Sequence, residues 1–428
     1  MPNRSLSIDS SAVARLVRNR TMRFVLPAGL AIYLAYYLTG FKPARIWLLE
    51  PSVDTLIEFN RAREVFASGV YPQQASAGNF NAVFPYPPSA VLLFYALGIF
   101  GLRVFMAIRI LLMIAGLLIT FQASVAGEND DSRAAWLLLG AIALVLCDTP
   151  VSWDLRAGNT NLVFLGLILA GYGLLGRRPW LAGSLLALSI SLKLFSGLLL
   201  LWLLVNGPRA ALYAAAIVIA ALWIVLPVAL FGVGQTVSLY ASWREQLRLI
   251  SGPGVYSFIA SMRHGPPLVT VRRAIIVLSG AAPEAPFTRW LLGALWAIWL
   301  GAVGWYAARA WRSGHVTAPS RPALADWTVL LLTPLPLSPW LEPYHSVPML
   351  TGAILCLVIV LDKYMGDADR IIAAMALAAV GLMHAVRIPL PIRGFVLLAQ
   401  FSLLVIAFGL LRPSLAARPA SVPPALDL

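Results

Sequence analysis

The sequence has few charged residues and almost no cysteine. Only 12% of its 428 residues are Asp, Glu, Lys or Arg, whereas 60% are hydrophobic, and this composition excludes an ordinary soluble domain. The two cysteines, Cys147 and Cys356, lie in apolar runs far from each other and from any His at metal-ligand spacing. The sequence therefore predicts neither a disulfide framework nor a zinc site.

Long apolar runs separated by short polar joints make up most of the chain. Because a membrane-spanning helix needs roughly 20 apolar residues, about eleven to thirteen membrane segments fit. We therefore predict an all-α polytopic integral membrane protein. Residues 1–411 are expected to form a single membrane domain, and residues 412–428 a proline-containing tail that is disordered in the cytoplasm.

The net charge of +14 comes from basic residues spread over many loops rather than gathered in one patch. Membrane topology and anionic lipids explain this distribution better than a nucleic-acid partner does. Arginines recur in the loops around 177–178 and 309–321, which the positive-inside rule places in the cytoplasm. The loops over 42–86, 148–161 and 232–286 then face the exterior of a plasma (inner) membrane.

Unusual polar residues gather in the predicted external loops. They are Asp54, Glu58, Tyr86, Asp154, Asn159, Asn161, Arg263, Glu342, Tyr344 and His345. A lipid-linked glycan transporter or flippase would instead place its charges near the bilayer midplane and show an inverted repeat, which is not visible in the sequence. The one-sided cluster favours an enzyme over a transporter or a non-catalytic assembly partner.

The first external loop predicts an amphipathic helix lying on the membrane surface. Pro51 stands near its first turn and Gly69 ends the pattern. Asp54 and Glu58 share one face, while apolar side chains such as Phe59 lie largely on the other. The two carboxylates are expected to face a cavity. The alternative is that Asp54 only stabilises the helix N-terminus through the macrodipole.

Several short motifs occur in an order that resembles glycosyltransferase family 87. These motifs are Asp54, Gly69-Val70-Tyr71, Phe84-Pro85-Tyr86-Pro87-Pro88 at the start of a membrane helix, Ala157-Gly158-Asn159-Thr160-Asn161, Lys193, and Ser338-Pro339-Trp340 before His345. The sequence departs from the family pattern at Asn159, where Gln is usual, at Leu194, where Pro commonly follows the Lys, and at Tyr344-His345, where some members carry paired His. The resemblance covers nearly the whole chain.

The resemblance implies a GT-C-type helical bundle that transfers a hexose, with mannose favoured. The donor would be a polyprenyl-phosphate sugar, and the acceptor a glycan or glycolipid at the outer face of the membrane. Asp54 matches the position of the family's base, and a positioned carboxylate that takes the acceptor proton contributes roughly 10²–10⁴-fold in rate. Since such a donor lacks the diphosphate that often recruits Mg²⁺, no metal or other cofactor is expected.

Three cationic or hydrogen-bonding residues are candidates for the donor phosphate: Lys193, Arg263 and His345. A lysine inside a long apolar stretch indicates a functional site, although Lys193 could instead extend to the membrane interface. Arg263 could be a solvated loop charge, and His345 a histidine satisfied at a helix end.

The remaining candidates bind the sugar or shape the site. Asp154, Asn159 and Asn161 could hydrogen-bond sugar hydroxyls, or could cap helices instead. Tyr86, flanked by prolines, could form a rigid rim for a sugar or an isoprenoid, or could simply precede a proline-marked helix start.

Overall fold

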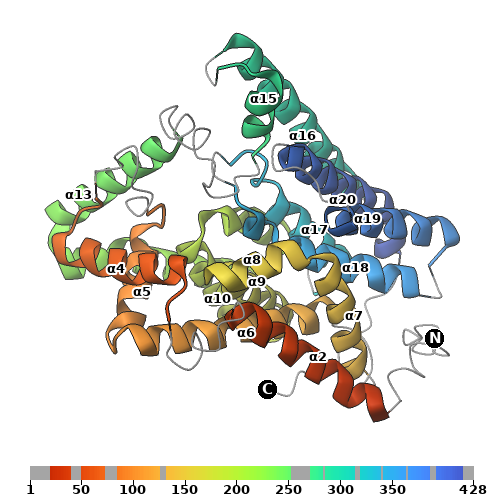
Figure 1. Ribbon diagram of the computed structural model, residues 1–428, viewed down its shortest axis with the longest axis horizontal. Coiled ribbons are helices and arrows are strands. Elements are labelled where there is room, and N and C mark those ends of the chain that lie inside the picture. Colours follow the sequence, from red (N-terminus) through yellow and green to blue (C-terminus); the bar gives the residue numbers. More distant parts are fainter. Residues whose placement is uncertain are drawn as a thin grey trace.

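The computed structural model describes residues 20–39, 50–72, 84–125, 132–251, 270–282, 285–313, 319–338, 341–362, 365–385 and 392–417. Every regular element within these ranges is a helix (Figure 1). The predicted all-α fold is therefore confirmed.

The first half of the chain forms helices that carry most of the candidate residues. In order they are α2 (Arg20–Thr39), α4 (Val53–Ser68), α5 (Pro88–Gly98), α6 (Leu102–Val125), α7 (Ser132–Leu146), α8 (Asp148–Ala157), α9 (Asn161–Leu174), α10 (Pro179–Leu192), the 3₁₀ helix η2 (Leu194–Gly197), α11 (Leu198–Asn206) and α12 (Arg209–Ala220).

The second half continues with a π-helical turn and further long helices. In order they are η3 (Ala221–Val225), α13 (Leu226–Ser251), α15 (Val271–Ser279), α16 (Pro286–Arg312), α17 (Arg321–Leu332), the 3₁₀ helix η4 (Pro343–Ser346), α18 (Met349–Leu361), α19 (Asp367–Ala385) and α20 (Arg393–Ala416). Helices α16 and α20 lie side by side (Figure 1).

Several helices are long and apolar enough to cross a membrane. Within the described ranges they are Leu102–Ser124, Arg209–Arg248, Pro286–Arg312, Pro343–Leu361 and Arg393–Ala416. A further span results if Leu137–Leu146 and Asp148–Ala157, which are bent by 88°, count as one. The chain is thus a multi-pass membrane protein, and the predicted total of crossings stays a prediction.

The predicted amphipathic helix of the first external loop is α4, which ends at Gly69 with φ 69°. The helix buries Glu58, Ala62 and Val65, which share one face because they are spaced by four and then three residues. Ala62 and Val65 pack in a cluster with Phe94 of α5 and Phe105 of α6. The predicted separation of the carboxylates and the apolar side chains onto opposite faces of this helix is therefore wrong, because Glu58 lies on the same buried face as the apolar residues.

The segment over 148–161, predicted as an external loop, begins as helix α8. Gly158 ends this helix in the left-handed conformation with φ 66°, which favours glycine because it has no Cβ. A Cβ there would overlap the hydroxyl oxygens of Ser52 and Thr55. Helix α4 therefore starts directly against the α8–α9 turn.

The apolar stretch over 180–205 is interrupted at Lys193, as the sequence indicates. Helix α10 ends at Leu192, Lys193 has extended backbone with φ −144° and ψ 117°, and η2 follows. The break directs the Lys193 side chain into the protein, where it is buried.

The sequence predicts that a disordered tail starts at residue 412, but the last helix continues past this position. Helix α20 continues to Ala416, and Arg412 is only 2% exposed with Nη2 3.3 Å from Asp326 Oδ2 on α17. The ion pair and burial hold this turn in place, so residues 412–416 are not disordered. Residues 418–428 lie outside the described ranges.

Candidate active site

The predicted site residues come from five separated segments: α4, the loop before α5, the α8–α9 turn, the α10–η2 break and η4. All of them except Arg263 lie in the described ranges, and Arg263 lies outside.

A chain of hydrogen bonds joins a carboxylate to an ammonium. Asn159 Nδ2 donates to Asp54 Oδ2 at 2.8 Å, and Lys193 Nζ donates to Asn159 Oδ1 at 2.8 Å. Lys193 Nζ also donates to Asn161 Oδ1 at 2.6 Å. Asp54 and Lys193 are therefore separated by one amide side chain, although they are 139 positions apart in the sequence.

Asp154 orients the amides of this chain. Its Oδ1 accepts from Asn161 Nδ2 at 2.7 Å, and its Oδ2 accepts from the backbone N–H of Leu162 at 2.9 Å. It thus caps the N-terminus of α9, which is the alternative role that the sequence left open. Asp154 is fully buried, and its carboxylate fixes the position of Asn161.

Asp54 does not serve merely as a helix cap. It lies in the first turn of α4, but its carboxylate accepts from Asn159. Burial raises the pKa of Asp54 above its ordinary value, while the Asn159 hydrogen bond and the positive charges of Arg109 and Lys193 act in the opposite direction. This carboxyl is therefore desolvated, hydrogen-bonded by one amide and close enough to two positive charges to interact with them.

Lys193 does not extend to a membrane interface. It is 7% exposed, it interacts electrostatically with the carboxylates of Asp154, Asp54 and Glu342, and its Nζ lies 6.0 Å from the Tyr86 ring centre. A buried ammonium held this way is costly unless it is paired, so the contacts favour a functional role over snorkelling.

Glu58 is engaged by two partners and points into the protein. Its side chain accepts from the Tyr86 hydroxyl and forms an ion pair with Arg109 of α6, and it is 1% exposed. Burial, followed by the neighbouring Asp54 charge, raises the pKa of Tyr86, which keeps its hydroxyl protonated as a donor. The same Tyr86 segment also opens α5 with Pro88 at its first turn, which confirms the predicted helix start.

Arg109 is the residue that the sequence reasoning missed. It is 3% exposed, and its Nη2 donates to the carbonyl of Gly158. The available signal was its position as the lone charge inside the apolar run over 104–123, since an intramembrane arginine indicates a functional site by default.

His345 is held in one tautomer by η4. The backbone N–H of Glu342 donates to His345 Nδ1 at 3.0 Å, and the Glu342 side chain accepts from the His345 backbone N–H. Since Nδ1 accepts, the proton of the neutral ring lies on Nε2. His345 is thus arranged to donate a hydrogen bond from Nε2 rather than to accept one, and its ring lies 6.4 Å from that of Phe195 beside Lys193.

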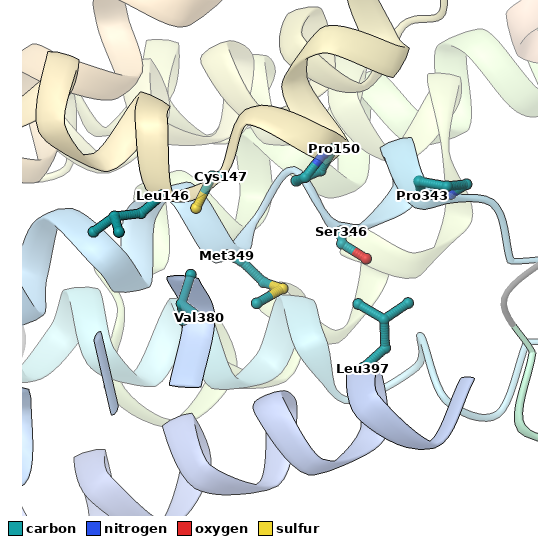
Figure 2. A pocket seen from close by; sticks show the side chains of 8 residues that line it. All are labelled: Leu146, Cys147, Pro150, Pro343, Ser346, Met349, Val380 and Leu397. Atoms are coloured by element: carbon teal, nitrogen blue, oxygen red, sulfur yellow. The ribbon is translucent and has the colours of Figure 1, made fainter. Parts of the chain in front are cut away.

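A small pocket lies next to this cluster, between the α7–α8 bend, η4, α18, α19 and α20. Figure 2 shows its lining, which consists of Leu146, Cys147, Pro150, Pro343, Ser346, Met349, Val380 and Leu397. This lining is mainly apolar and contains none of the predicted site residues. Within the described ranges, no group of three or more His, Cys, Asp or Glu side chains is placed to hold a metal ion.

The spans and the inward-facing cluster define the class as polytopic membrane proteins with a buried charged site. The chain belongs to glycosyltransferase family 87, whose model matches residues 84–339. It is therefore a membrane glycosyltransferase, and the transporter and assembly-partner alternatives are set aside. The matched region contains Tyr86, Asn159 and Lys193.

A curated relative extends this result over most of the chain. The sequence is 24% identical over 397 residues to the polyprenol-phosphate-mannose-dependent alpha-(1-2)-phosphatidylinositol mannoside mannosyltransferase of Mycolicibacterium smegmatis, which covers 89% of this chain and 83% of the relative. No solved structure gives a significant match.

Proposed function

We propose that the protein transfers a hexose, with mannose favoured, from a polyprenyl-phosphate donor to a glycan or glycolipid at the outer face of the plasma membrane. The observation that carries this proposal is the Asp54–Asn159–Lys193 chain, which places a candidate base and a candidate phosphate ligand one side chain apart. The donor type is supported by the name of the Mycolicibacterium relative.

Asp54 acts as the base in an inverting direct displacement. As the acceptor hydroxyl oxygen bonds to the anomeric carbon, its proton passes to the Asp54 carboxylate, and the bond from that carbon to the phosphate oxygen breaks. The lipid phosphate leaves with the bonding electron pair, so no strong general acid is needed. The raised pKa of Asp54 makes its carboxylate a better proton acceptor than an exposed one.

Lys193 and His345 serve the departing phosphate. Lys193 supplies a buried positive charge, and its hydrogen bonds to amide oxygens can be exchanged for phosphate oxygens without reorganising the backbone. His345 supplies a neutral Nε2–H donor, because its Nδ1 is occupied. Such donors stabilise the charge that develops on the leaving group. Arg263 remains a third candidate.

Asn159 and Asn161 bind the sugar and the phosphate through the same amide groups that hold Lys193. Asp154 positions Asn161, and Tyr86 with Glu58 forms the wall beside them. Tyr86 therefore presents a fixed aromatic ring next to the ammonium, where an apolar sugar face or the first isoprene unit can pack.

The proposal is tested by incubating purified protein with a panel of polyprenyl-phosphate hexoses and pentoses, with phosphatidylinositol mannosides as acceptors. We expect release of free lipid phosphate and formation of a glycosylated lipid, both greatest with the mannosyl donor. The Asp54→Asn protein is the control for enzyme-independent hydrolysis. Transfer from a nucleotide sugar but not from any lipid donor would contradict the proposal.

A further inference from the structure

Glu58 and Arg109 form a buried ion pair that connects the external helix α4 to α6. The Arg109 guanidinium also lies over two aromatic rings, 5.8 Å from the centre of Phe94 and 5.5 Å from that of Phe105. Burying two charges costs several kcal/mol per ion in typical proteins. Stability alone does not explain an ion pair that is this costly to bury. The contacts that Arg109 and α4 make with a further segment, the α8–α9 turn, suggest a second role.

Both α4 and Arg109 bind the carbonyl of Gly158. Thr55 Oγ1 donates to Gly158 O at 3.2 Å, and Arg109 Nη2 donates to the same oxygen. Because Gly158 has no side chain, the first turn of α4 lies directly against it. Arg109 thus binds α4 through Glu58 and the α8–α9 turn through Gly158.

Asp54 and Asn159 stand one residue away from these anchor points. Asp54 precedes Thr55 on α4, and Asn159 follows Gly158 in the turn. The 2.8 Å hydrogen bond between their side chains therefore depends on how α4 sits on the turn.

We propose that Glu58 and Arg109 are a positioning pair that docks α4 onto the Gly158 turn and thereby sets the distance from Asp54 to Asn159 and Lys193. The inference rests on the proposed function for the identity of Asp54 as base. Glu58, the other carboxylate on the same helical face, is then a counter-ion rather than a second candidate base, because its oxygens contact Tyr86 and Arg109.

The pair also sets the charge around Asp54. The charged or titratable groups that interact with Asp54 are Arg109 of α6, Lys193 of the α10–η2 break, Tyr86 of the loop before α5, and Tyr344 of η4. Arg109 lowers the pKa of Asp54. Removing Arg109 therefore raises that pKa, and the base becomes protonated at a higher pH.

The experiment compares Arg109→Met, Arg109→Lys and the double variant Glu58→Leu/Arg109→Met with the full-length protein. For Arg109→Met we expect kcat to fall about 10²-fold, as for a catalytic group displaced by roughly 1 Å, with a smaller change in the donor KM. The acid limb of its pH–rate profile should move to higher pH. In Arg109→Lys, which keeps the charge, that limb should stay near its original pH.

Amide hydrogen exchange of α4 supplies a readout that needs no substrate. We expect faster exchange over 53–68 in Arg109→Met, because α4 is no longer docked. Arg103→Met is the matched control, since Arg103 lies on the same helix α6 and is exposed, and it should leave α4 exchange, kcat and the pH–rate profile unchanged.

The double variant separates positioning from stability. Replacing a buried ion pair by apolar groups of similar volume is often neutral or stabilising, so its unfolding temperature should return toward the original value while kcat stays low. Recovery of kcat together with stability would overturn the proposal, as would unchanged α4 exchange in Arg109→Met. If the unmodified protein transfers no sugar at all, the proposed function fails, and the exchange measurement still decides the docking role.

Discussion

Asp54 combines a desolvated carboxylate with a single amide donor and two nearby positive charges. This environment raises its pKa without pairing it so tightly that it loses basicity. Glu58, one helical turn away, is 1% exposed and fully engaged. The two acids of α4 therefore have different environments, which their shared helical face alone does not reveal.

Asp54→Asn should lower sugar transfer by about 10²-fold or more, because the amide cannot take the acceptor proton. Expression and donor binding should survive, since Asn keeps the size and can still accept from Asn159. Turnover and donor affinity of the purified variant check this. Near-normal turnover in Asp54→Asn combined with its loss in Glu58→Gln would transfer the role to Glu58.

The same substitution should change stability in a pH-dependent way. Burial raises the pKa of Asp54 in the folded state, so this group favours folding below its ordinary value of 3.8 and favours it less as pH rises through the folded-state pKa. Asp54→Asn should therefore be more stable than the original protein at neutral pH, with an advantage that shrinks toward acid. Unfolding temperatures measured in detergent across this range test the sign, and an advantage that grows on acidification would refute it.

Lys193→Met should chiefly weaken donor binding. A charged contact to phosphate is worth about 1.5–3 kcal/mol, which corresponds to roughly 10–100-fold in affinity. Equilibrium binding of a labelled polyprenyl-phosphate sugar measures this directly, with Arg178→Met at the exposed α9–α10 turn as a control for lost positive charge. Unchanged donor affinity would remove Lys193 from the phosphate site.

At the scale of elements, the site depends on how helix ends meet. Helix α4 abuts the α8–α9 turn at Gly158, and α10 ends where Lys193 enters the cluster. Each of these junctions is a break in regular structure, where a side chain can leave the helical direction. The polar cluster is therefore assembled from helix termini rather than from helix faces, apart from α4 and Arg109.

Gly158→Ala tests the α4 junction. The left-handed conformation alone costs about 1 kcal/mol for alanine, and the added Cβ would overlap Ser52 and Thr55. Gly101→Ala is the matched control, because Gly101 also has positive φ, 94°, but nothing within 4 Å of the Cβ position. We expect both variants to lose some stability and only Gly158→Ala to lose turnover. Equal activity in the two proteins would mean that α4 docking is not required.

At the scale of the whole molecule, the described helices bring the cluster together from most of the chain length, while a separate buried network joins other helices. Asp326 of α17 accepts from Tyr306 of α16 at 2.6 Å and from Trp202 of α11 at 3.2 Å, and pairs with Arg412 of α20. None of the predicted site residues takes part in this network. It links four helices that carry no proposed catalytic group.

The membrane orientation can be checked with single cysteines placed at exposed positions. Glu50→Cys precedes α4 on the predicted external side, and Arg178→Cys lies in the predicted cytoplasmic α9–α10 turn, and both positions are exposed. In a background lacking the buried Cys147 and Cys356, an impermeant thiol reagent added to intact cells should label Glu50→Cys alone. Labelling of Arg178→Cys from outside would reverse the orientation and exclude an outer-face site.

Composition and pattern by themselves determined the class of this protein. Long apolar runs require helices in a bilayer, because every backbone group must be satisfied within its own segment, and the ordered motifs around Tyr86, Asn159 and Lys193 identified the family that the comparison then showed. The same patterns named Asp54 and His345 as site candidates. Apolar runs and short motifs are local features of the sequence, so they can be recognised without the tertiary structure.

Only the tertiary structure decided which of these residues meet and what each can do. Arg109 stands out in the sequence only as a lone charge in an apolar run, and the structure adds that it contacts both α4 and the α8–α9 turn. His345 became a donor only when the Glu342 backbone was seen to occupy its Nδ1. Pairings of this kind depend on helix packing between segments far apart in the chain, and no spacing within one segment encodes them.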